Sequence, residues 1–378
     1  DATKYPNFES GRATRWAGEA LMARVFLFYT GYYGMTSLPL VGGGEISKDE
    51  VIDWLEDCRD NSGHGLVGDF RNLWPYTNTY TRDDYPYVAG KVGIDGKPLE
   101  WAGDGNVETI FATKFSNVYA QSAGYVNYYP LYFAPPFNVG EDTFPWGRGW
   151  GKACVTPNLW NEWLAEEPND LRRQASIIDV RDHNEMKNYT WGANNEMEET
   201  GYWQKKIVAV AAKDPESGNF VSGFAVLASG ATDHIQFCNT QDLIHIRYAD
   251  VLLMHSELTE TTAGINAVRA RAGLNGISTY SLDALKKERR FELAFEGLRW
   301  FDLMRWGDVS EALEKQVGQP IYNRGVAINM PTFSTGFRTR YEATGGFWPI
   351  PDSQIDLSEG VLTQNKGWTE TDAIFQGW

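Results

Sequence analysis

The sequence predicts a mainly α-helical protein in which two helical blocks flank a large irregular subdomain. Near the amino terminus and again between residues 246 and 305, apolar residues recur every three or four positions, which is the spacing of a buried helix face. Between these blocks, residues 61–241 are dense in Gly, Pro, Asn and aromatic residues and contain only short periodic runs. A structureless loop of that length is unusual in a compact domain, so we expect this region to fold irregularly against the helices.

The first helical block is a predicted helix pair. Residues 12–29 have apolar side chains at helical spacing, and Gly31 and Gly34 are expected to end this helix. Ser47 and Glu50 have the spacing of a capping box, in which each side chain accepts a backbone N–H at the start of a helix. The second helix is therefore expected to begin there and to pair with the first.

The second helical block contains another pair and a long helix. Residues 246–258 and 265–272 are the predicted pair. Residues 259–264 separate them, which is a shorter connection than we expect. A third, long helix is predicted over residues 281–305, where Ser281 serves as the N-cap.

Two shorter elements are expected inside the irregular region, a strand within residues 108–116 and a helical turn over residues 158–164. We interpret the chain as one domain, residues 1–378. Within it we expect a helical hairpin at 1–60, a loop-rich aromatic binding subdomain at 61–241, a helical scaffold at 242–310, and C-terminal loops with a closing segment at 311–378.

The charge balance argues against nucleic acid as a partner. The chain has 34 Lys and Arg against 50 Asp and Glu, a formal charge of −16, and no run of four or more basic residues. An anionic membrane surface is disfavoured for the same reason. No stretch reaches 18 consecutive apolar residues, which excludes a transmembrane helix, and no signal peptide is recognisable at Asp1.

Motifs for catalysis or metal binding do not stand out. The five histidines show no pair at ligand spacing beside an acidic motif, and the three cysteines are too few and too widely spaced for a zinc site or a disulfide framework. Ser229 lacks the preceding glycine of a nucleophile elbow. Adjacent acidic pairs such as Glu166 and Glu167 are expected by chance among 50 acidic residues. We therefore predict no catalytic residue, no metal site and no cofactor.

The aromatic content is the most informative functional signal. Trp, Tyr and Phe make up 14% of the chain, and many of them fall outside periodic segments. A flat ring stacks on the apolar C–H face of a sugar, while neighbouring amides and guanidiniums bind its hydroxyls. We expect about two thirds of the rings between residues 119 and 163 to pack the core, which leaves three or four for a ligand.

We place the candidate glycan site within residues 117–151. Trp146 and Trp150 are favoured, because Pro145 and several glycines around them suit display on a loop. A second, weaker candidate is the segment 322–341. The predicted glycan-binding residues are Trp146, Trp150, Tyr125, Tyr128, Tyr129, Tyr132, Asn127, Asn138 and Arg148.

Four motifs, in the same order, resemble those of the SusD/RagB family. Residues 11–34 and 108–111 match less specifically but also in order, so the resemblance spans nearly the whole chain. The four motifs are residues 246–257 (IRYADVLLMHSE) with 265–274 (INAVRARAGL) for the paired helices, residues 288–303 (ERRFELAFEGLRWFDL) for the long helix, and residues 348–351 (WPIP) followed by 362–365 (LTQN) for the closing segment.

The resemblance implies degenerate tetratricopeptide-like helix pairs with a loop-rich ligand face. It also implies a lipid-anchored, cell-surface protein of the Bacteroidetes outer membrane that binds oligosaccharide or polysaccharide for a SusC-like TonB-dependent transporter and has no catalytic residues. The family's N-terminal part, which carries the lipidated cysteine, does not precede Asp1. Contact with the membrane is therefore expected only through a lipid anchor absent from this chain.

The charged side chains late in the predicted long helix are interpreted as structural. Arg289, Arg290, Glu296, Arg299 and Asp302 are expected to form a charge network that ties the helices to loops. Buried arginine pairs of this kind specify a fold rather than perform chemistry.

Two other classes of protein remain open. An all-helical glycan-cleaving enzyme, a glycosidase or a lyase, would share the Trp richness and the acidic balance, and it predicts a paired acid and base in an aromatic groove. A helical-repeat adaptor for protein partners would not need so many aromatic residues in loops.

Overall fold

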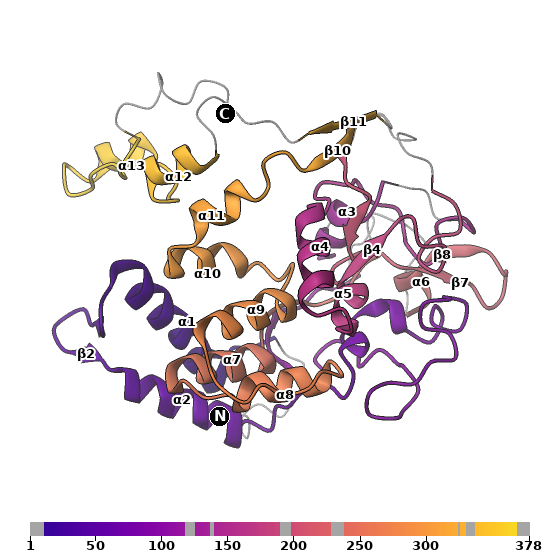
Figure 1. Cartoon of the computed structure of the whole chain (residues 1–378), viewed down its shortest axis with the longest axis horizontal. Helices are drawn as coiled ribbons and strands as arrows, with labels where there is room; N and C mark the ends of the chain where they lie inside the picture. Colours follow the sequence, from indigo (N-terminus) through magenta and orange to yellow (C-terminus); the bar gives the residue numbers. More distant parts are fainter. Residues whose placement is uncertain are drawn as a thin grey trace.

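The computed structural model describes residues 11–117, 125–136, 140–189, 198–227, 238–323, 326–329 and 337–368. It confirms a helix-rich fold. Helices from the amino-terminal and carboxyl-terminal parts of the chain pack together into one helical block, and the central part of the chain forms an irregular region with short strands beside it (Figure 1).

The amino-terminal helix pair is confirmed. Helix α1 (Arg15–Tyr33) packs along α2 (Lys48–Asn61), with the small alanines of α1 buried between them. Ser47 and Glu50 form the predicted capping box at the start of α2.

Gly31 lies inside α1, so the stop predicted at this residue is wrong. Gly34 ends the helix instead, in the left-handed conformation with a φ of 66°. A Cβ at Gly31 would lie 2.7 Å from the carbonyl oxygen of Arg305 in α10 (Arg299–Trp306). Glycine is therefore required at this position for the two helices to pack closely.

The second helix pair is also confirmed, as α7 (Tyr248–Thr259) and α8 (Ala263–Arg271). Its connection is short because the helices approach each other closely. A Cβ at Gly264 would lie 2.1 Å from the Leu252 carbonyl oxygen, and the Gly264 N–H donates to Ser256 Oγ at 3.0 Å. Helix α7 also packs on α2, which joins the two pairs into one layer.

The predicted long helix is wrong as a single element. Ser281 caps α9 (Leu282–Glu292) as expected, but the chain then turns before α10 begins. At the turn, the Glu292 carbonyl oxygen accepts from Arg247 Nη2 at 2.7 Å and from Lys206 Nζ at 2.8 Å. Because distant side chains use an acceptor that a continuing helix would need, the helix ends here.

The irregular region is built from short helices and antiparallel strand pairs. The strand predicted within residues 108–116 is confirmed as β3 (Thr109–Thr113), and the helical turn predicted at residues 158–164 is confirmed as part of α4 (Pro157–Glu166). The helices are η3 (Phe70–Leu73), η4 (Pro75–Thr77), α3 (Tyr129–Phe133), α4 (Pro157–Glu166), α5 (Leu171–Ser176) and α6 (Gly223–Leu227). The pairs are β3 (Thr109–Thr113) with β9 (Leu243–Arg247), β4 (Ile177–Asp179) with β6 (Tyr202–Gln204), and β7 (Ala211–Lys213) with β8 (Phe220–Ser222).

The remaining elements lie at the edges of the molecule. A small hairpin of β1 (Leu38–Pro39) and β2 (Glu45–Ile46) connects α1 to α2. The carboxyl-terminal part contains the helices α11 (Val309–Glu314), α12 (Phe337–Thr344) and α13 (Asp352–Leu357). Its strands β10 (Pro320–Asn323) and β11 (Val326–Asn329) form a sheet with β5 (Glu198–Glu199) from the central part of the chain.

The two parts of the fold are joined by a buried cluster of charges around Glu292. The carboxylate of Glu292 binds Arg172 of α5 at 2.9 Å, Arg247 of β9 at 2.5 Å, and Arg271 of α8. Arg247 and Arg271 both bind Glu108 at 2.8 Å, next to β3. Burial raises the pKa of the Glu292 carboxyl, but the three guanidiniums outweigh burial and hold this pKa well below its usual range.

The predicted charge network is confirmed for four of its five residues. Arg299 forms no ion pair with any residue that the structure describes. The observed pairs are Arg289 with Asp250 and Asp302, Arg290 with Glu162, and Glu296 with Arg247 and Lys206.

A second buried charge organises the irregular region. The Lys205 ammonium is fully buried, lies 2.7 Å from Glu185 Oε1, and has a pKa that burial lowers to about 8. Four aromatic rings surround it. The ring centroids of Tyr87, Tyr76, Tyr85 and Trp146 lie 3.6, 5.0, 5.2 and 5.5 Å from Nζ.

We predict that Glu292→Gln lowers the free energy of unfolding by about 3–5 kcal/mol, because it leaves three buried guanidiniums without their shared carboxylate. Urea denaturation followed by tryptophan fluorescence measures the loss. The matched control is Glu311→Gln, which removes an exposed partner of Lys315 and is expected to leave the unfolding midpoint unchanged. Equal midpoints for the two variants would contradict a central role for the cluster.

Candidate functional site

Several aromatic side chains of the predicted site lie exposed on and beside α3. The exposed fractions are 62% for Tyr125, 45% for Tyr129, and 37% for both Tyr132 and Trp150. The Tyr132 and Trp150 rings meet edge to face with centroids 5.1 Å apart, and Tyr128 lies 6.3 Å from Tyr132. We call Tyr128, Tyr129, Tyr132 and Trp150 the aromatic patch.

The backbone of residues 147–152 holds Trp150 firmly against α3. The Trp150 N–H donates to the Leu131 carbonyl oxygen, and the Lys152 N–H donates to that of Tyr132, both at 2.8 Å. A Cβ at Gly149 would lie 2.1 Å from the carbonyl oxygen of Ala134, so only glycine allows this approach. The backbone that carries the exposed ring is therefore fixed before any ligand arrives.

Trp146 does not belong to the patch, and the prediction that its ring is displayed is wrong. Its side chain is fully buried, and its Nε1 donates to the Glu185 carbonyl oxygen at 3.0 Å. The ring forms part of the cage around Lys205. The neighbouring Gly147 binds the Ala209 carbonyl oxygen at 2.7 Å, so the glycine here serves close packing rather than loop display.

The predicted polar partners also differ in burial, as the two tryptophans do. Asn127 is buried, with Nδ2 donating to the Gln241 carbonyl oxygen at 2.8 Å and Oδ1 accepting from the Tyr129 N–H at 2.9 Å. It fixes the start of α3, so its predicted contact with a glycan hydroxyl is wrong. Arg148 is exposed, as a ligand contact requires, and Asn138 lies outside the described residues.

Lys152 is a candidate ligand contact that the sequence interpretation missed. Along residues 147–152, Arg148, Trp150 and Lys152 are exposed, whereas the glycines between them are buried. A glycine at every second position was a visible signal for this alternation, and it leaves one exposed basic residue two positions before Trp150 and another two positions after it.

Buried carboxyl groups lie elsewhere. Burial raises the pKa of Glu199 to about 7, and burial together with the nearby Asp242 raises that of Asp104 to about 7. Neither residue belongs to the aromatic patch. Within the described ranges, no three His, Cys, Asp or Glu side chains gather closely enough to hold a metal ion. In the same part of the chain, no helix has the length and apolarity to cross a bilayer.

The structure combines helix pairs with an exposed aromatic surface on the irregular region beside them. Comparison with known families assigns this arrangement to one of them: the profile of the SusD family matches residues 107–368. The chain belongs to the SusD family, as its four motifs indicated.

Solved structures support the fold. A laminarin binding SusD-like protein matches 96% of this chain with a TM-score of 0.61 and 22% identity. Surface glycan-binding protein A from Bacteroides thetaiotaomicron, solved in complex with laminarihexaose, matches 94% with a TM-score of 0.62 and 19% identity. The chain covers 64% of each of these structures.

A curated relative is more similar in sequence but is also longer. SusD-like protein P2 of Formosa agariphila is 26% identical over 249 residues, which are 61% of this chain and 43% of that protein. The chain therefore spans less than half the length of this relative.

We predict that Trp146→Ala and Trp150→Ala both lower the free energy of unfolding, but by very different amounts. Trp146→Ala should lower the free energy of unfolding by about 3–5 kcal/mol, because it opens a cavity beside the buried Lys205. Trp150→Ala should cost less than half as much, because part of the ring already faces solvent. Chemical denaturation of both variants measures their free energies of unfolding. Equal losses of this free energy would mean that Trp150 is a core residue.

Proposed function

We propose that the chain is the glycan-binding body of a cell-surface lipoprotein that captures oligosaccharide or polysaccharide and does not cleave it. The observation that carries the proposal is the aromatic patch, in which exposed rings are held in place by backbone hydrogen bonds. Membership of the SusD family supports it, as do the laminarin and laminarihexaose named for two relatives of the same fold.

The geometry of the patch suits a sugar chain. The Trp150 and Tyr132 rings meet at 61°, so together they offer two differently inclined faces to successive sugar residues. Each face stacks on pyranose C–H groups, while Arg148, Lys152 and the tyrosine hydroxyls supply donors for sugar hydroxyls. Because backbone hydrogen bonds already fix the segment that carries Trp150, little backbone entropy is lost on binding.

The proposed partner is a SusC-like TonB-dependent transporter in the outer membrane, to which the protein delivers its glycan. Family membership supports this part of the proposal. A permanent complex of this kind should bury more than about 2,000 Å².

We predict that Trp150→Ala weakens glycan binding by roughly 1–3 kcal/mol, the range of a hot-spot aromatic residue. Laminarihexaose, a xyloglucan oligosaccharide and the best ligand from a glycan array are titrated calorimetrically, and the recovered glycan is sized by chromatography. The matched control is Trp348→Ala, which truncates an exposed tryptophan outside the patch and should leave affinity unchanged.

Two results would contradict the proposal. Equal affinity of the wild type and Trp150→Ala for every bound glycan would remove the patch from the site. Progressive shortening of the glycan by the purified protein would favour the glycan-cleaving enzyme instead.

For the partner, we predict that the full-length protein co-purifies with a TonB-dependent transporter from native outer membranes in mild detergent. Mass spectrometry of the purified complex should find the two proteins in equal amounts. A full-length protein that is repeatedly recovered alone would argue against a permanent complex.

A further inference from the structure

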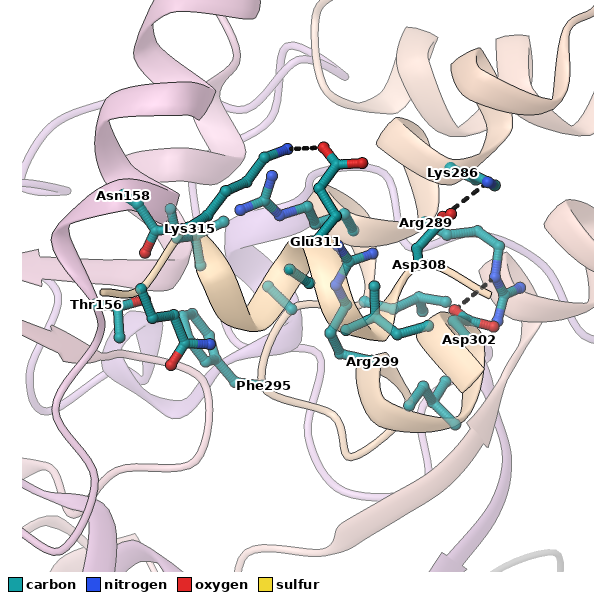
Figure 2. A pocket seen from close by; sticks show the side chains of 18 of the residues that line it. Thr156, Asn158, Lys286, Arg289, Phe295, Arg299, Asp302, Asp308, Glu311 and Lys315 are labelled. Atoms are coloured by element: carbon teal, nitrogen blue, oxygen red, sulfur yellow. Dashed lines mark hydrogen bonds and ion pairs between the residues drawn. The ribbon is translucent and has the colours of Figure 1, made fainter. Parts of the chain in front are cut away.

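A cavity separate from the aromatic patch opens between α4, α9, α10 and α11 (Figure 2). Its volume is about 400 Å³, within the range of small-molecule sites. Leu293, Ala294 and Leu298 give it an apolar wall, and Phe295 adds a partly buried ring. The charged lining consists of Lys286, Arg289, Arg290, Arg299, Lys315, Asp283, Asp302, Asp308 and Glu311.

Arg299 stands apart from the other basic residues of the cavity. Its side chain reaches into the middle of the cavity in Figure 2, and it forms no ion pair with a described residue. The other four cations each bind a carboxylate. The pairs are Lys286 with Asp308, Arg289 with Asp250 and Asp302, Arg290 with Glu162, and Lys315 with Glu311.

The carboxylates that act on the charge of Arg299 are already engaged in other ion pairs. Asp302, Asp308 and Glu162 act on its charge, but Asp302 binds Arg289 and Arg305 while the other two bind Lys286 and Arg290. Burial, followed by the nearby Arg290, lowers the pKa of Arg299 to about 10, so the guanidinium still carries its charge at neutral pH. A partly desolvated cation without a partner is unfavourable, and an incoming anion would relieve this cost.

The starts of two helices add to the positive electrostatic potential of the cavity. The first turns of α4 and α10 line the cavity, through Thr156, Asn158, Leu298 and Arg299. Neither helix has a side-chain cap hydrogen bond, so their first backbone N–H groups are not satisfied in that way. A helix start with free N–H groups favours negative charge.

We propose that this cavity binds the carboxylate or sulfate group of an acidic sugar, with Arg299 as the anchoring cation. The guanidinium fork matches either oxyanion in a bidentate arrangement. The apolar wall and the Phe295 ring meet the sugar ring that carries the group. The inference rests on the proposed glycan-binding function and narrows it to glycans that contain acidic residues.

The test compares two matched ligands, an oligosaccharide containing glucuronate and the same oligosaccharide with its carboxyl groups reduced to alcohols. Calorimetry should show at least tenfold tighter binding of the acidic form to the wild-type chain. Arg299→Gln should abolish this preference while still binding the neutral form as the wild type does. Arg338→Gln, which removes an exposed arginine from α12, is the matched control and should keep the preference.

Sodium sulfate tests whether the cavity binds a free inorganic anion rather than an anionic group carried by a sugar. It should raise the melting temperature of the wild type but not of Arg299→Gln, and it should compete with the acidic oligosaccharide. Stabilisation by sulfate without any preference for the acidic oligosaccharide would mean a site for inorganic anions and would overturn the proposal. Should Arg299→Gln fail to fold, Arg299→Lys replaces it, because it keeps the charge, loses the fork, and should lower the acidic preference at least threefold.

The remaining outcomes separate this inference from the proposed function. Neutral and acidic forms that bind equally, through Trp150, would overturn the acidic site and leave glycan binding intact. An acidic preference that survives in Arg299→Gln would overturn the assignment to this cavity. Failure of every oligosaccharide to bind would overturn both proposals.

Discussion

The buried carboxylate of Glu292 is the constraint on which the two parts of this fold depend. Three guanidiniums converge on it from α5, α8 and β9, so two elements of the irregular region and one helix of the helical block share one acceptor. Such a cluster is stable only when every member is paired, because a lone charge in this environment is unfavourable by several kcal/mol. Its geometry therefore sets where α9 stops and how the central region sits against the helices.

The aromatic richness has two separate explanations in the structure. Around Lys205, rings solvate a buried ammonium ion and make up much of the core of the irregular region. Around α3, a few rings face solvent and are supported from behind by backbone hydrogen bonds. The first group accounts for stability, and the second group is the one on which the proposed glycan binding depends. Counting aromatic residues in a sequence cannot separate the two.

Local signals in the sequence predicted much of the helical block, since the spacing of apolar residues and the capping box at Ser47 act within a few residues. The long helix failed because Arg247 and Lys206, far away in the sequence, bind the Glu292 carbonyl oxygen. Trp146 and Trp150 share the same glycine-rich surroundings and yet differ completely in burial. Only contacts between distant segments distinguish them. That Arg299 has no ion pair among the described residues is likewise a property of the folded chain.

The alternation along residues 147–152 has an evolutionary consequence. The backbone N–H groups of residues 147, 149, 150, 151 and 152 fix the segment, whereas the side chains of Arg148, Trp150 and Lys152 are exposed. In the proposed function, substitutions at these three exposed positions change which sugars are preferred at a smaller cost to stability than substitutions of the buried glycines. Selection on the preferred sugar and selection on the fold therefore act on different positions of one short segment.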